Sequence, residues 1–139
     1  MTLDPKLTIS SAVQVAFSVV LGDGYKDSDP AVRLSQNPKF GDYQINGIMG
    51  LAKKLGQNPR ELAEKIVGAI NLEGFAQSLE VAGPGFINVT LTPSMLVDLC
   101  VGMDTVSLGI KPDSDTHPIA IDLCGVNVAK QLHVGHLRS

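Results

Sequence analysis

The sequence predicts an α+β fold for its first 110 residues, in which a small antiparallel sheet packs with helices. Segment 86–91 alternates apolar and polar residues as a strand does, and segment 75–81 carries apolar markers. The turn AGPG joins these two segments. Other segments repeat apolar residues at helical spacing and carry helix start signals. A length of 139 residues with 44% apolar content is typical of an ordered globular domain.

The first predicted helix covers 12–21, with an apolar face that begins slightly earlier. That face consists of Ile9, Val13, Ala16, Phe17 and Val20. The segment lacks the basic start and the cleavage site of a signal peptide and is too short to span a bilayer, so we expect no membrane partner. After a Gly- and Asp-rich loop, Val32 and Leu34 alternate with Arg33 as in a half-buried strand.

A helical hairpin is predicted next. Its first helix has an apolar stripe and ends at Gly56, a residue suited to a left-handed C-cap; the stripe is Ile45, Ile48, Met49, Ala52 and Leu55. The second helix starts at NPRE, with Asn58 as N-cap and Pro59 at the first helical position.

The two strands that follow place an aromatic ring and an amide on one face of the sheet. Alternation puts Ile87, Val89 and Leu91 on the core face and Phe86 with Asn88 on the other. Two structural explanations stay open: a helix covers Phe86, or backbone groups satisfy the Asn88 amide. Thr92 and Pro93 then begin another helix, which extends to about Gly102.

The polar, proline-containing stretch KPDSDTHP is typical of a linker, and we place a domain boundary near 109–117. Beyond it, IAIDLCGVN has the pattern of a buried strand that leads into the helical segment NVAKQLHVGHLRS. At the start of a helix, two histidines and a glycine suit the binding of phosphate oxygens. A metal site is not expected, because no third ligand lies near His133 and His136.

The net charge of −3 hides an uneven distribution. Residues 33–65 hold six basic and three acidic residues, whereas the rest of the chain holds five basic and eleven acidic ones. A local excess of cations fits either a small anion-binding surface or solvated helix faces. Cys100 and Cys124 lack the spacing of a zinc or redox site, so we expect reduced, buried thiols and a cytoplasmic protein.

Several motifs in order carry a family resemblance. VRLSQNPKFGDYQIN, LAKKLGQNPRELAEKI, VAGPGFINVTL and NVAKQLHVGHLRS resemble the N-terminal part of the arginyl-tRNA synthetases, which are class I aminoacyl-tRNA synthetases. The resemblance implies an N-terminal additional domain at 1–110 that contacts the tRNA elbow, and a linker at 111–118. It also implies that 119–139 begins a Rossmann-type catalytic domain, with its first strand and the start of a helix.

The resemblance also implies roles for residues near the C-terminus. HVGH matches the HIGH signature, so His133, Gly135 and His136 would bind ATP, used with Mg²⁺, and the two histidines would stabilise the transition state. Lys130 would lie near the nucleotide. Asp122 and Asn127 would bind the substrate L-arginine. The resemblance implies no structural metal.

In the additional domain, Phe86 and Asn88 match the family's aromatic and amide pair that reads an unstacked D-loop base of tRNA(Arg). Phe40, Tyr43, Gln44 and Asn46 match the motif FGDYQxN, for which RNA contact and packing of the domain are both open. Neither DNA nor a membrane is expected as a partner.

One departure concerns the arginine pocket, where Cys124, Gly125 and Val126 replace the family's serine- and proline-containing pattern before Asn127. We expect an N-terminal fragment of an arginine–tRNA ligase that contacts tRNA and does not catalyse by itself. One alternative is a stand-alone tRNA-binding module with a vestigial HxGH segment. Another is a different class I nucleotidyltransferase-like enzyme, which would leave GDYQIN and GPGFINVTL unexplained.

Overall fold

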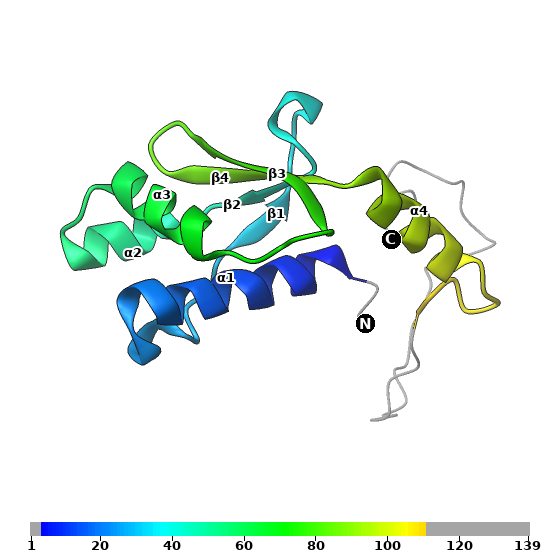
Figure 1. Cartoon of the computed structure of the whole chain (residues 1–139), viewed down its shortest axis with the longest axis horizontal. Coiled ribbons are helices and arrows are strands. Elements are labelled where there is room, and N and C mark those ends of the chain that lie inside the picture. The colour runs from blue at the N-terminus through cyan, green and yellow to red at the C-terminus, as the bar shows by residue number, and fades with distance from the viewer. Residues whose placement is uncertain (1–3, 111–139) are drawn as a thin grey trace, which may run out of the picture.

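The computed structural model describes residues 4–110, which form an antiparallel sheet and helices as predicted (Figure 1). The described elements are α1 (Pro5–Leu21), η1 (Asp23–Tyr25), β1 (Val32–Leu34), η2 (Pro38–Phe40), β2 (Tyr43–Ile45), α2 (Ile48–Leu55), α3 (Pro59–Ala69), β3 (Ala76–Ala82), β4 (Phe86–Leu91) and α4 (Pro93–Met103). The four strands lie in the order β1-β2-β4-β3, and every neighbouring pair is antiparallel. The α+β prediction is therefore confirmed for this part of the chain.

The hydrophobic core lies on one face of the sheet, which we call the inner face. Ile45, Ile87 and Val89 point into it and are fully buried, as predicted for the two β4 residues. Helix α1, which runs beneath the sheet in Figure 1, contributes the fully buried Phe17, and α3 contributes Leu62. Burial of such side chains contributes about 1.5–3 kcal/mol each, which makes this cluster the main source of the domain's stability.

The predicted helix boundaries rest on local signals that the structure confirms. Asn58 Oδ1 accepts a hydrogen bond from Arg60 N at 3.0 Å and Thr92 Oγ1 accepts one from Met95 N at 3.2 Å. Gly56 has the left-handed conformation expected of a C-cap, with φ 65°. The first helix begins earlier than predicted, at Pro5, because the Asp4 side chain caps it.

The prediction that Ile45 belongs to the helical hairpin was wrong. Ile45 ends β2, where it pairs with Val32 and Ile87, and α2 begins only at Ile48. A strand of three residues has too little pattern to compete with a helical stripe that Ile45 also fits. Leu34 also departs from the prediction, because it lies at the exposed end of the edge strand β1 and is not half-buried.

Helix α4 lies at the other end of the molecule from α2 (Figure 1). Only Met95 and Leu99 pack against the core, and the helix has no buried residue. Cys100 is exposed, which corrects the prediction of a buried thiol. None of the helices in 4–110 is long and apolar enough to cross a membrane. The predicted linker, the start of a catalytic domain and Cys124 lie outside the described residues.

Candidate nucleic-acid interface

Polar residues form a row across the face of the sheet opposite the core, which we call the outer face. The register places Arg33 of β1 beside Gln44 of β2, Gln44 beside Asn88 of β4, and Asn88 beside Glu80 of β3. Residues that face each other across antiparallel strands have Cβ atoms about 4.5–5.5 Å apart, close enough for their side chains to interact. One row therefore combines a cation, two carboxamides and a carboxylate.

Asn88 is the buried member of this row and keeps 6% of its surface exposed. Its Oδ1 accepts a hydrogen bond from Gln44 Nε2 at 3.0 Å. The amide oxygen is thus satisfied by a side chain and not by backbone groups, the explanation left open from the sequence. Because a buried amide without a partner is costly, this bond stabilises both side chains in place.

Phe86 lies two residues before Asn88 on the outer face and is half-buried. Its ring flanks the β3–β4 turn, since a Cβ built on Gly83 would lie 3.6 Å from Phe86 Cδ2. Gly85 brings the same turn against α3: it has φ 133°, and a Cβ there would lie 2.9 Å from Pro59 O. Glycine permits both the backbone conformation and this close approach. The ring and the amide therefore occupy neighbouring positions on the outer face, and the turn before them packs against the start of α3.

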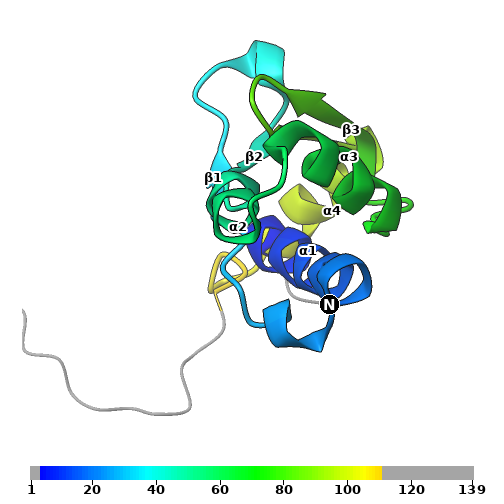
Figure 2. The ribbon, with the colours of Figure 1, turned by 90° about the vertical axis from the view of Figure 1, so that its left-hand side faces the viewer.

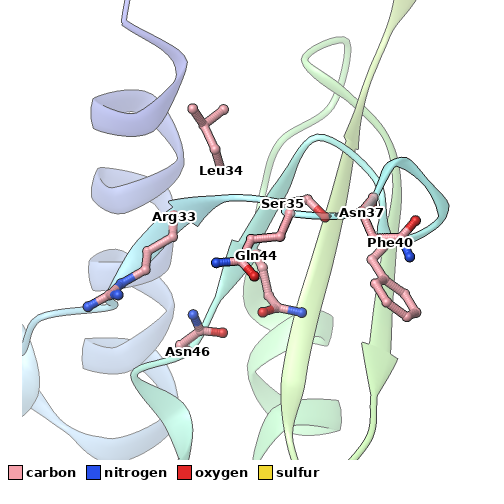
Figure 3. A pocket seen from close by; sticks show the side chains of 8 residues that line it. Arg33, Leu34, Ser35, Asn37, Phe40, Gln44 and Asn46 are labelled. Carbon is pink, nitrogen blue, oxygen red and sulfur yellow. Dashed lines mark hydrogen bonds between the residues drawn. The ribbon is translucent and has the colours of Figure 1, made fainter.

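A hollow of about 390 Å³ adjoins the row on the β1 and β2 side. Its lining is mostly polar and comprises Arg33, Leu34, Ser35, Gln36, Asn37, Phe40, Gln44 and Asn46. In Figure 3, Gln44 lies between Asn46 and Phe40, with Arg33 on the strand beyond Asn46. Asn46 Oδ1 is buried and lacks a hydrogen-bond partner among the described residues, which leaves one acceptor of the lining unsatisfied.

The motif FGDYQIN connects the hollow to the strand that bears Phe86 and Asn88. Gly41, with φ 78°, passes so close to β4 that a Cβ there would lie 2.7 Å from Val89 O. Asp42 Oδ2 accepts a hydrogen bond from Leu91 N at 2.8 Å. In Figure 2, the cyan segment that contains η2 projects from the sheet on the side away from α1. The motif thus anchors this segment to β4.

Tyr43 does not join the other candidate residues, because it points to the inner face. It pairs with Val89 and packs against the core. Burial, followed by the carboxylates of Asp4 and Asp42, raises the pKa of Tyr43 above 10.0. The contact of Tyr43 with the core supports the packing interpretation of Tyr43 that the sequence left open.

The cations predicted from the sequence fall on two surfaces. Arg33 is exposed on the outer face and Lys39 is exposed in η2. The helical hairpin carries the other exposed ones, which are Lys53, Lys54, Arg60 and Lys65. Arg60 pairs with Glu64 at 3.5 Å, an exposed contact of little strength. Of these six cations, Arg33 and Lys39 lie in the segment 33–46, which borders the hollow.

The structure brings together Phe86, Asn88 and Gln44, and it places Phe40 at the hollow with 49% of its surface exposed. Arg33 completes the row, although the sequence indicated it only as one of a group of cations. Its position between Val32 and Leu34 in a predicted strand was the signal that could have placed it on the outer face. The residues expected to bind ATP and arginine lie outside the described part: His133, Gly135, His136, Lys130, Asp122 and Asn127. Among residues 4–110, no group of three or more His, Cys, Asp or Glu side chains is placed to hold a metal ion.

Comparison with known families and proteins identifies relatives of this chain. The family model described as arginyl tRNA synthetase N terminal domain matches residues 6–91. The arginine–tRNA ligase of Actinobacillus succinogenes is 48% identical over 127 residues, and that of Colwellia psychrerythraea is 42% identical over 134 residues. Each match covers 91% of this chain, and the chain spans 22% and 23% of the length of these relatives.

Two solved structures share the fold. The arginyl-tRNA synthetase of Plasmodium falciparum superposes with a TM-score of 0.62 at 24% identity, covering 73% of this chain and 18% of that one. The arginyl-tRNA synthetase of Thermus thermophilus superposes with a TM-score of 0.57 at 22% identity, covering 96% of this chain and 21% of that one. At these identities the likeness supports the arrangement of helices and strands.

Proposed function

The chain belongs to the family of arginyl-tRNA synthetase N-terminal domains, and from this premise we propose that its outer sheet face binds an unpaired D-loop base at the elbow of tRNA(Arg). The base stacks on Phe86 and forms hydrogen bonds with the amide of Asn88. Proteins recognise splayed RNA bases by this combination of an aromatic platform and a polar edge.

The observation that carries this proposal is the placement of Phe86 and Asn88. They are successive residues on one face of β4, and they stand opposite the apolar residues Ile87 and Val89 of the core. The Phe86 ring does not belong to the core cluster, and its exposed part offers a flat surface to a base. The neighbouring amide, held in place by Gln44, supplies hydrogen bonds at a fixed position.

The cations near the hollow supply the remaining interaction that RNA binding requires. Arg33 lies in the same cross-strand row as Asn88, and Lys39 lies in η2 next to Phe40, which lines the hollow. A strand whose base reaches Phe86 carries its phosphates past these side chains. Contacts of this kind provide affinity without sequence preference and weaken as salt rises.

For the longer protein we propose the activity of an arginine–tRNA ligase located in the cytoplasm. Such an enzyme uses ATP with Mg²⁺ to activate L-arginine and transfers it to tRNA(Arg). The resemblance of HVGH to the class I signature supports roles for His133 and His136 at the nucleotide. For the 139-residue chain by itself we propose tRNA binding without arginyl-adenylate formation. ATP–pyrophosphate exchange by the purified chain, with arginine and tRNA present, would contradict this second statement.

Equilibrium binding of the 139-residue chain to a tRNA(Arg) transcript tests the proposal. Base stacking contributes about 1–3 kcal/mol, so Phe86→Ala should weaken binding roughly 5- to 150-fold. Val19→Ala is the matched control, because Val19 is exposed on α1 away from the outer face. Absence of binding at low salt, or equal affinity of the Phe86→Ala and Val19→Ala variants, would overturn the proposal.

A further inference from the structure

The hydrogen bond between Gln44 and Asn88 orients a carboxamide at the site, and we propose that Gln44 determines which base is accepted, by positioning Asn88 and by presenting an acceptor of its own. It holds the Asn88 amide so that Asn88 presents a hydrogen-bond donor to the base. This inference rests on the proposed RNA-binding function and adds a selectivity that neither the ring nor the cations provide.

The orientation follows from the donor and the acceptor of that bond. Gln44 Nε2 donates to Asn88 Oδ1 at 3.0 Å, and the two residues are direct partners in the register of β2 and β4. A carboxamide carries its oxygen and its nitrogen on opposite sides of one carbon. With Oδ1 turned toward β2, Asn88 Nδ2 points away from β2.

The Asn88 nitrogen stays available for a ligand. No hydrogen bond joins Nδ2 to another described residue, and among residues 4–110 the sole buried side-chain polar atom without a partner is Asn46 Oδ1. Asn88 Nδ2 therefore reaches the surface, although the residue as a whole is 94% buried, its exposed share being 6%. A fixed N–H group that reaches the surface of the outer face recognises an acceptor, such as a carbonyl oxygen or a ring nitrogen of a base.

Gln44 adds the complementary group. Its Nε2 is used by Asn88, whereas its Oε1 has no hydrogen-bond partner among the described residues. The pair thus offers a donor from Asn88 and an acceptor from Gln44 next to each other. Bases carry neighbouring donors and acceptors in different orders, so a fixed order in the protein favours some bases over others.

Without Gln44 this order is lost. The terminal torsion of asparagine is broad and roughly two-fold, so a free amide presents either its oxygen or its nitrogen. A single hydrogen bond biases the two orientations by about two- to tenfold. This is the factor by which loss of Gln44 should reduce discrimination between bases, while stacking on Phe86 and contacts with phosphates continue.

The experiment uses tRNA(Arg) transcripts and the 139-residue chain. Abasic substitution at each unpaired D-loop position in turn identifies the recognised nucleotide, and the four bases are then compared at that position. The wild-type chain should prefer some bases over others. Gln44→Met, which keeps the length of the side chain but removes the carboxamide with its donor and its acceptor, should reduce that preference about two- to tenfold with little change in affinity for the abasic RNA.

Gln44→Glu gives a sharper result. A carboxylate only accepts, so it should draw Asn88 Nδ2 toward itself and turn Oδ1 to the base. The order of preference among the four bases should then change, a result that a purely structural role of Gln44 would not produce. Comparing ratios between bases removes the uniform repulsion of RNA by the added charge.

The outcomes separate the two proposals. Base preferences that stay the same in Gln44→Met and Gln44→Glu, while Phe86→Ala still weakens binding, would overturn the role of Gln44 and keep the RNA site. Both proposals would be overturned if every abasic RNA bound as tightly as the intact RNA and if the Phe86→Ala variant bound as tightly as the wild-type chain. Thermal unfolding of each variant, monitored by circular dichroism, confirms that the compared proteins are folded.

Discussion

Single side chains decide how the segment around the hollow is attached to the sheet. Asp42 shows this most clearly, because its backbone N donates to Val89 O at 2.9 Å and its carboxylate accepts from Leu91 N at 2.8 Å. Leu91 is 4% exposed, so water is a poor substitute for that acceptor. One residue of the FGDYQIN motif thus provides hydrogen-bond partners for two backbone groups near the end of β4.

Replacement of Asp42 by alanine should therefore destabilise the domain. The Leu91 N–H would be left buried without its acceptor, a loss of about 1–3 kcal/mol in the free energy of unfolding. Asp42→Asn is the matched control, because its side-chain oxygen can still accept the bond. Urea unfolding of the two variants measures the difference, and equal midpoints would contradict this role of the carboxylate.

Gln44 and Asn88 show what sequence reasoning finds at the scale of a residue and what it misses. Alternation along FINVTL is enough to place Asn88 beside Phe86 on the outer face, because the period of a strand is two. The partner of Asn88 lies 44 residues earlier in the chain. Their contact depends on the pairing of β2 with β4, which no local pattern announces.

At the scale of an element, the longer helices and the β3–β4 hairpin were predictable from the sequence. Their start signals, such as Asn58 before Pro59, act through hydrogen bonds between residues close together in the chain, which do not depend on how distant segments pack. β2 was not predictable, because three residues carry little periodicity and its stability comes from pairing on both sides. The sequence indicated a strand at Val32 and Leu34 and named Gln44 as a candidate, but the pairing through β2 that joins them to β4 was not predictable.

The close approach of the segment before β2 to β4 gives a test at this scale. A Cβ on Gly41 would lie 2.7 Å from Val89 O, and φ 78° is unfavourable for other residues. Gly41→Ala should cost about 1–3 kcal/mol of unfolding free energy.

Gly50→Ala is the control for the same substitution. Gly50 lies in α2 with open space where the Cβ would be, so this change should stabilise the domain by about 0.5–1 kcal/mol. Chemical denaturation of both variants shows the contrast. A Gly41→Ala domain as stable as the wild type would mean that the segment does not pass close to β4.

The edge strand β1 provides the phosphate contact in our account. Arg33→Gln should weaken tRNA binding nearly equally for all base variants and reduce the slope of log affinity against log salt by about one. Lys6→Gln serves as the control, since Lys6 lies on α1 on the inner side of the sheet. Salt titrations of both variants measure the slopes, and identical changes would show that Arg33 contributes only to the overall charge.

At the scale of the whole molecule, the sheet separates stability from binding. The inner face carries the fully buried side chains Ile45, Ile87 and Val89, and the outer face carries the row from Arg33 to Glu80. A net charge of −3 does not contradict RNA binding, because the cations relevant to the site are gathered near one surface. The α+β class and the two faces of β4 followed from the sequence, whereas the row across β1, β2 and β3 required the strand order.

RNA binding as proposed depends above all on stacking of the Phe86 ring on one unpaired base of tRNA(Arg). A double-mutant cycle combining Phe86→Ala with abasic substitution at the recognised D-loop nucleotide tests it most directly, with dissociation constants measured for all four pairs. We expect each change to weaken binding roughly 5- to 150-fold and the two together to weaken it hardly more than one alone, because both remove the same contact. Losses that simply multiply, or an abasic transcript that binds as tightly as the intact one, would contradict the account.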